Sequence, residues 1–153
     1  MSDAQAVMIH SKNTQDLLGR ILASKTLSGG VNVPELHSVL LLSADTGSMI
    51  SYCTSLDIKD NDVVNNLKIM GLLIKDKYFS DENKHCEKGY AISETQSIYT
   101  YEVENLHCCA TRLEDSDLLY VFLAQKEFPY GLLVMKMKAS LKSLDQLIGY
   151  KLG

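Results

Sequence analysis

The stretch Leu118-Leu119-Tyr120-Val121-Phe122-Leu123-Ala124 decides the fold, because it is apolar throughout. A strand without polar alternation must be covered on both faces, so it belongs in the middle of a sheet with helices above and below. The corner Phe128-Pro129-Tyr130-Gly131 follows it. Pro129 fixes φ at the turn, and Gly131, which has no Cβ, is expected to allow the next helix to approach the sheet closely.

The last third of the chain is predicted to be one amphipathic helix that runs almost to Gly153. Its apolar residues recur at helical spacing and are expected to cover the sheet: Leu133, Met137, Leu141, Leu144 and Ile148. Its polar residues are expected to point away from the sheet: Lys136, Lys138, Ser143 and Asp145.

The first half of the chain shows two further helices and a hairpin. Asn13 or Thr14 is expected to cap a first helix that ends before Ser28-Gly29-Gly30. A strand at 36–44, a turn at 45–48 and a returning strand at 49–55 form the hairpin. A second helix is capped at Asp60, Asn61 or Asp62 and runs to about Lys77.

The second helix carries a wider apolar arc than one sheet contact needs. Val63, Leu67, Met70 and Ile74 share one face, and Val64, Leu72 and Leu73 widen it. The polar residues 80–96 are interpreted as a surface loop, with solvated charges at Asp81, Glu82, Lys84, Glu87 and Lys88. Strands at 97–104 and 106–113 then lead to the central strand.

This order predicts an α/β fold, a three-layer sandwich around a five-stranded antiparallel sheet. The second helix covers one face, and the first and last helices cover the other. A single domain is expected over residues 1–153, with a mobile loop at about 79–96.

Composition argues against several classes of function. The net charge of −4 comes from scattered acids and bases, without the basic stripe that nucleic-acid binding requires. No apolar run approaches the ~20 residues that span a bilayer, and Ser2 stands where myristoylation needs glycine, so we expect membrane contact only through a partner. The four cysteines lack C-x-x-C spacing and are interpreted as reduced thiols of a cytosolic protein.

No catalytic, cofactor-binding or metal site is expected. His107 and Cys108 are neighbours in a strand, where successive side chains project to opposite faces, so they cannot form a nucleophile–base pair with each other. His10, His37 and His85 lack metal-binding spacing, and Gly29-Gly30 lacks the continuation of a phosphate loop. A small-molecule-sensing α/β domain stays an alternative function, which would need a cavity between sheet and helix lined by convergent polar groups.

Short motifs along the chain resemble the roadblock/dynein-light-chain superfamily. Gly29-Gly30-Val31, Val39-Leu40-Leu41-Leu42 and Gly47-Ser48-Met49-Ile50-Ser51-Tyr52 resemble the first roadblock hairpin, and Tyr130-Gly131-Leu132-Leu133 resembles the entry to the last helix. Further stretches, among them Ile98-Tyr99-Thr100-Tyr101-Glu102, are similar to the roadblock-type small subunits of the fungal EGO complex, the counterpart of the animal Ragulator.

The resemblance implies a non-enzymatic scaffold without cofactors. Such subunits pair with a roadblock-domain partner or with themselves, and a lipidated subunit wraps them and anchors them to the cytoplasmic face of the vacuolar membrane. They position a Rag-type GTPase heterodimer for amino-acid signalling to the target-of-rapamycin complex, with a link to microautophagy.

The expected protein interface lies on the second helix and on an edge strand, whose open backbone groups can pair with a partner strand. The interface residues are Val64, Leu67, Lys68, Gly71, Ile98, Tyr99, Thr100, Tyr101 and Val103. Two plainer interpretations stay open. The tyrosine pair could be half-buried packing, and the second helix could be a deeply buried layer.

Overall fold

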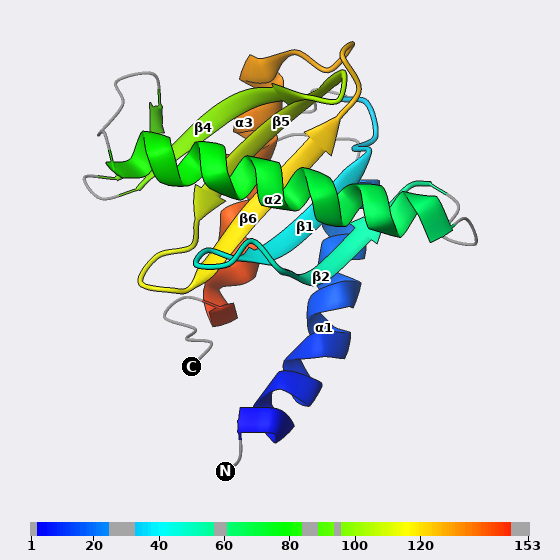
Figure 1. The fold of residues 1–153 in the computed structure, drawn as a ribbon, viewed down its shortest axis with the longest axis vertical. Coiled ribbons are helices and arrows are strands. Elements are labelled where there is room, and N and C mark those ends of the chain that lie inside the picture. The colour runs from blue at the N-terminus through cyan, green and yellow to red at the C-terminus, as the bar shows by residue number, and fades with distance from the viewer. Residues whose placement is uncertain (1–2, 25–32, 57–60, 84–88, 94–95, 148–153) are drawn as a thin grey trace.

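The computed structural model describes residues 3–24, 33–56, 61–83, 89–93 and 96–147. Three α-helices, a terminal 3-10 helix (η1) and six strands follow one another (Figure 1). Their bounds are α1 Asp3–Ala23, β1 Ser38–Ser43, β2 Met49–Thr54, α2 Asn61–Asn83, β3 Tyr90–Ala91, β4 Ser97–Val103, β5 Leu106–Arg112, β6 Leu118–Ala124, α3 Tyr130–Ser140 and η1 Leu141–Leu147.

The strands form one antiparallel sheet in the order β2-β1-β6-β5-β4-β3. β6 lies between β1 and β5, and all seven of its residues are buried. Val121 is opposite Leu40 on one side and Ala110 on the other. The prediction that the uninterrupted apolar stretch is a central strand is therefore confirmed.

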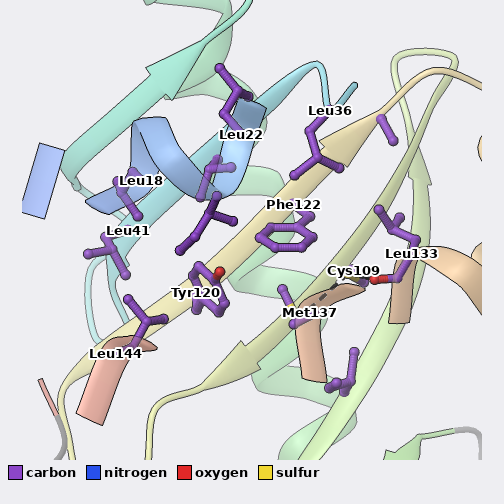
Figure 2. Close-up of a cluster of buried hydrophobic side chains, with 14 of the residues drawn as sticks. Leu18, Leu22, Leu36, Leu41, Cys109, Tyr120, Phe122, Leu133, Met137 and Leu144 are labelled. Carbon is purple, nitrogen blue, oxygen red and sulfur yellow. Dashed lines mark hydrogen bonds between the residues drawn. The ribbon is translucent and has the colours of Figure 1, made fainter. Parts of the chain in front are cut away.

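The helices divide between the two faces of the sheet, as the sequence predicted. α2 crosses one face, and α1 and α3 lie on the other (Figure 1). Two apolar clusters fill these layers. Leu67, Met70 and Ile74 of α2 belong to the first cluster. The second cluster joins α1 and α3 to the sheet, with Tyr120 and Phe122 at its centre (Figure 2).

The sheet has six strands, so the prediction of five is wrong. The additional strand, β3, consists of Tyr90 and Ala91 and pairs with Ile98 and Ser97 of β4. It lies inside the segment interpreted as a loop. Two residues are too few for an alternating pattern, so the sequence carries no periodic signal for this strand.

Two helices are longer than predicted. α1 begins at Asp3, so Asn13 and Thr14 lie within the helix and do not cap it. α2 reaches Asn83, six residues past the predicted end at Lys77, because buried Tyr78 and the partners of its last turn hold it on the sheet.

The last helix also differs from the prediction. α3 ends at Ser140 and continues as the 3-10 helix η1, although Leu133, Met137 and Leu144 are buried as expected. Lys136 was expected to point outward but is buried, and its ammonium group donates a hydrogen bond to the carbonyl oxygen of Ser24. A Cβ at Gly131 would meet no described atom within 4 Å, so this glycine permits no close approach.

Candidate protein-interaction surface

One side of α2 exposes large apolar side chains to solvent. We call these four residues the outer face of α2: Ile69 (54% exposed), Leu72 (47%), Leu73 (43%) and Phe79 (49%). Their spacing places them on one arc of the helix, with the exposed Asp76 within it. Single exposed apolar residues are ordinary, but a group that shares one helix face is typical of a surface that another protein covers.

The opposite side of α2 fixes its position on the sheet. Leu67, Met70, Ile74 and Tyr78 are buried there at the helical spacing of three and four residues. Gly71 lies among them, and a Cβ at this position would come within 3.0 Å of Cδ2 of Leu42. The missing side chain therefore lets α2 approach β1 closely.

Side-chain hydrogen bonds fasten the C-terminal end of α2 to β4 and β5. The Tyr101 hydroxyl donates to Oδ2 of Asp81 at 2.7 Å. Arg112 donates twice to Glu82, from Nε at 3.0 Å and from Nη2 at 2.7 Å. Two parallel bonds of this kind fix both distance and orientation. Asp81 and Glu82 are therefore paired, and the prediction that they are solvated loop charges is wrong.

Burial and hydrogen bonding both shift the pKa values of Tyr101 and Arg112 at the C-terminal end of α2. Desolvation raises the pKa of Tyr101, and its hydrogen bond to Asp81 raises it further. The hydrogen bond to Glu82 raises the pKa of Arg112 above its ordinary value. Both groups thus keep their protons at neutral pH, and the bonds that fasten α2 persist there.

The register of β4 shows which backbone groups face the open edge of the sheet. Glu104 and Asn105, with φ of 52° and 64°, form a two-residue turn of type I′ between β4 and β5. Such a turn is closed by a hydrogen-bonded pair, here Val103 and Leu106. Because hydrogen-bonded and non-hydrogen-bonded pairs alternate, the N–H and C=O groups of Thr100 and Glu102 point away from β5.

β4 is an edge strand over only part of its length. β3 pairs with Ser97 and Ile98, and the part of the chain that the structure describes places no strand beside Thr100–Val103. The Tyr130 hydroxyl braces the strand by donating to the carbonyl oxygen of Tyr101 at 3.0 Å. α2 crosses this face of the sheet (Figure 1), and Asp81 at its C-terminal end contacts Tyr101 of β4.

The structure divides the nine predicted interface residues into three groups. Leu67, Gly71, Ile98, Tyr99 and Val103 are buried within the chain; Val64, Thr100 and Tyr101 are half-buried; Lys68 is exposed. The side chains of Leu67, Ile98, Tyr99 and Val103 belong to the core clusters. Contact with a partner stays a prediction for all nine residues. Tyr99 and Tyr101 lie on the same side of the sheet, the side that α2 covers.

Sequence reasoning did not assign the outer face of α2 to the interface. The sequence feature that pointed to this exposed face was the excess width of the apolar arc, which included Leu72 and Leu73. Periodicity shows that an arc is too wide but does not show which part of it meets the sheet. Ile69 and Phe79 lay outside the predicted arc altogether.

Cys108 and His107 do not form a catalytic pair. Cys108 is fully buried in the cluster under α2, and burial raises the pKa of its thiol. His107 projects to the other face, where its ring stacks on Tyr130 with centroids 3.9 Å apart and Nδ1 lies 2.8 Å from the carbonyl oxygen of Phe128. The predicted separation of these two side chains is confirmed.

The described residues also bear on metal binding and on membrane crossing. Among them, no group of three or more His, Cys, Asp and Glu side chains is arranged to hold a metal ion. None of the helices in the described ranges has the length and apolar character that crossing a membrane demands.

A hollow of about 450 Å³ opens at one end of the sheet beside the first half of α2. Leu56 and Ile69 contribute apolar surface to it, and His37 and Glu104 contribute polar groups. Desolvation lowers the pKa of His37. The sensing alternative called for a cavity between a helix and the sheet lined by polar groups, and this hollow, bordered by α2 and Leu106 of β5, keeps that alternative open.

Solved structures with the same fold define the class of this protein. It resembles the roadblock/LC7 domain from Streptomyces avermitilis with a TM-score of 0.57 and 18% identity, over 86% of this chain and 94% of that one. It also resembles Myxococcus xanthus MglB with a TM-score of 0.59 and 12% identity, over 89% and 87%. MglB in a tetrameric arrangement gives a TM-score of 0.58 at 12% identity, over 90% and 88%. The chain is a roadblock-like α/β domain.

Sequence comparison then identifies the family. The family model described as Protein SLM4 matches residues 8–152. Protein SLM4 of Saccharomyces cerevisiae is 42% identical over 161 residues, which cover 96% of this chain and 99% of the yeast protein. The chain therefore belongs to the SLM4 protein family.

Proposed function

We propose that this protein is a non-enzymatic scaffold subunit that pairs with a second copy of itself or with another roadblock-type domain. The contact is made by the outer face of α2 and the open edge of β4. The observation that carries the proposal is the position of four exposed apolar side chains on α2. This helix crosses β4, an edge strand that β3 covers over only two residues.

Both features favour the same kind of partner. An open strand edge offers backbone N–H and C=O groups to another strand, and apolar side chains on a neighbouring helix add area that is removed from water. A partner with its own sheet edge and its own apolar helix could cover both. The MglB structure with a tetrameric arrangement indicates that roadblock folds assemble.

The proposal extends to a cellular role that the sequence resemblance implies. The protein would be a subunit of the Ragulator-like EGO complex on the cytoplasmic face of the vacuolar membrane. A lipidated subunit would wrap and anchor it, and the assembly would position a Rag-type GTPase heterodimer. The outcome would be amino-acid signalling to the target-of-rapamycin complex and a contribution to microautophagy. Membership of the SLM4 family supports this role.

The interface is tested by replacing Ile69, Leu72 and Leu73 with serine together. These side chains are 43–54% exposed, so the domain should keep its fold, while the apolar contact with a partner is lost. We expect the dimer, or the complex with a roadblock partner, to dissociate at concentrations that keep the wild-type protein assembled.

The matched control is Met135→Ser, because Met135 is equally exposed (51%) but lies on α3 at the other face of the sheet. It should leave assembly unchanged. Analytical ultracentrifugation measures both variants. If the triple variant assembled as well as the wild type, the outer face of α2 would not be part of the interface.

A further inference from the structure

Several segments of the chain meet where the hollow of about 450 Å³ opens at the end of the sheet. His37 precedes β1, Leu56 follows β2, Glu104 lies in the turn from β4 to β5, and Gln125 follows β6. The first half of α2 adds Asn66 to the lining. The antiparallel order of the strands therefore gathers polar side chains that are far apart in the sequence.

The position of His37 is fixed by the chain itself. Its backbone N–H donates to the carbonyl oxygen of Leu123 at 2.8 Å, and its own carbonyl oxygen accepts the N–H of Ser55 at 3.0 Å. The side chain is buried, with Nδ1 of the ring 2.9 Å from Oγ of Ser38. The imidazole is thus held in place before anything enters the hollow.

The Ser38 hydroxyl determines which ring nitrogen of His37 carries the proton. This hydroxyl has one proton, and the carbonyl oxygen of His37, 2.7 Å away, can only accept it. Nδ1 must therefore be the donor in its contact with Oγ of Ser38. Desolvation lowers the pKa of His37, so the ring is neutral at pH 7 and Nε2 has no proton. Nε2 is a hydrogen-bond acceptor.

Nε2 of His37 is open towards the hollow. No hydrogen bond within the described part of the chain uses this atom. Among the described side chains, the enclosed polar atom that lacks a partner is Oγ of Ser51, so solvent reaches Nε2. Because His37 lines the hollow, a ligand there can donate to Nε2.

Glu104 gives the hollow a negative charge. It is exposed in the type I′ turn at a φ of 52°, a position where Asn, Asp and Gly are usual. Its carboxylate has no ion pair with any described residue. The described lining includes no lysine or arginine either. The charge of the hollow therefore favours a cation.

The rest of the lining is apolar. Leu67, Met70 and Leu106 form its buried side. Leu56 and Ile69 are 40% and 54% exposed and lie where the hollow meets solvent. A ligand with an apolar chain would remove these side chains from water, which favours binding.

We propose that this hollow binds a small molecule that carries a protonated primary amine on an apolar chain. An ammonium group has three donors, and the lining offers it Nε2 of His37, the carboxylate of Glu104 and the amide oxygens of Asn66 and Gln125. The volume lies within the range of roughly 300–1,000 Å³ that is typical of small-molecule sites. This inference goes beyond the proposed function and does not rest on it.

The same lining disfavours other classes of small molecule. The carboxylate of an α-amino acid, or a phosphate group, would enter beside Glu104 without a described cation to compensate it. A purely apolar molecule would leave Nε2 of His37 without a donor and would desolvate it. Both a positive charge and an apolar chain are therefore needed.

Nuclear magnetic resonance titration of the full-length protein with n-hexylammonium tests the ligand class. The backbone amides of Leu56, Asn66 and Leu106 should shift and saturate. Hexanol, which has the same chain without the charge, should bind about ten times more weakly, and hexanoate should not bind. Each CH₂ removed between n-hexylammonium and n-butylammonium should weaken binding by up to about fourfold. Equal binding of hexanol or hexanoate would overturn the proposal.

A matched pair of variants tests the carboxylate. Glu104→Gln changes an exposed turn residue, so the fold should persist, and the Kd for n-hexylammonium should rise about tenfold. Glu114→Gln removes the same charge from an exposed position after β5, at the opposite end of the sheet, and should leave the Kd unchanged. Equal Kd values for the two variants would show that Glu104 does not hold the ammonium group, and the proposal would fail.

A second matched pair tests Nε2 of His37. Asparagine can place an amide nitrogen where Nδ1 lies and so keep the bond to Ser38, but it has no atom at the position of Nε2. Glutamine is longer and can place its amide oxygen there. With urea unfolding to show that both variants are folded, His37→Gln should retain binding and His37→Asn should weaken it about tenfold. The reverse order would contradict the role of Nε2.

A blocked lysine separates a small molecule from a protein side chain. Nα-acetyl-lysine methylamide carries its ammonium group on a four-carbon chain, and it should bind more weakly than n-hexylammonium because less apolar surface is buried. Tighter binding of the blocked lysine would assign the hollow to a lysine of a partner protein and overturn the small-molecule ligand. These titrations do not measure assembly, so failure of this inference leaves the proposed function standing.

Discussion

Replacing Tyr78 with phenylalanine removes one oxygen atom from the contact between α2 and the sheet. Tyr78 is buried, and its hydroxyl oxygen accepts the backbone N–H of Arg112 at 3.0 Å. Its ring also packs edge-on against Tyr99. Phenylalanine keeps the ring and its packing, so the change isolates the hydrogen bonds that the hydroxyl makes with Arg112 and Glu82.

The expected loss of folding free energy follows from the backbone N–H of Arg112, which loses its acceptor. A partly buried N–H without an acceptor costs about 1–3 kcal/mol, more than the net value of the bond itself. For a domain of this size each kcal/mol lowers the melting temperature by roughly 2–4 °C. The effect should be local as well, because the last two turns of α2 lose a contact that holds them to β5.

Urea unfolding measures the loss of stability, and amide hydrogen exchange at Arg112 locates it. Tyr90→Phe is the control, because Tyr90 is 41% exposed and a surface change of this kind stays within about 0.5 kcal/mol. If Tyr78→Phe shifted the urea midpoint no more than Tyr90→Phe, the end of α2 would not be held as described.

Three further predictions concern the other face and the membrane. Leu144→Ala should lower the free energy of unfolding by about 2–5 kcal/mol because Leu144 is fully buried, and half-buried Leu141→Ala should cost clearly less in the same urea titration. Burial lowers the pKa of Lys136 below its ordinary value of 10.5, so the folded state binds this proton less tightly than the unfolded state does. The free energy of unfolding should therefore rise with pH between the lowered pKa and 10.5. Lys136→Met should abolish this rise. If a lipidated partner anchors the protein, as proposed, the isolated chain should not sediment with liposomes, and loss of that partner in cells should release it from the vacuolar surface; retention there would contradict partner-dependent anchoring.

Sequence patterns were sufficient where burial was uniform along an element. β6 is apolar at every position, and its central place in the sheet follows from that alone. The sheet-facing spacing of Leu67, Met70 and Ile74 likewise predicted the layer that α2 forms. The two-layer arrangement of helices was therefore available from the sequence.

The features that were missed depend on contacts between distant segments. The last turn of α2 is polar and resembles a loop until Asp81 and Glu82 meet Tyr101 and Arg112. Lys136 is buried because its long aliphatic stem can lie in the core while its ammonium group reaches a carbonyl oxygen near α1. Neither partner is near in sequence, so no local pattern indicates the pairing.

The interface on α2 and β4 stays a prediction, and the structure shows how its residues are placed. The sequence named α2 and β4, and the structure finds open surface on both. It placed part of the interface on Leu67, which is buried under α2, and on Gly71, which lies against Leu42 of β1, because an apolar arc does not show which of its sides meets the sheet. The partial cover by β3 left no trace in the sequence pattern.

The measurement that tests the central claim most directly is the molar mass of Thr100→Pro in solution. The N–H of Thr100 points away from β5, so proline at this position removes a donor from the open edge and leaves the ladder with β5 intact. Light scattering should give a wild-type mass of twice the 17.0 kDa chain and a variant mass close to one chain. The variant should still unfold in one cooperative urea transition, at a lower midpoint because it no longer gains stability from dimerisation. A variant that stays dimeric at the same concentration would show that the edge of β4 is not where this protein assembles.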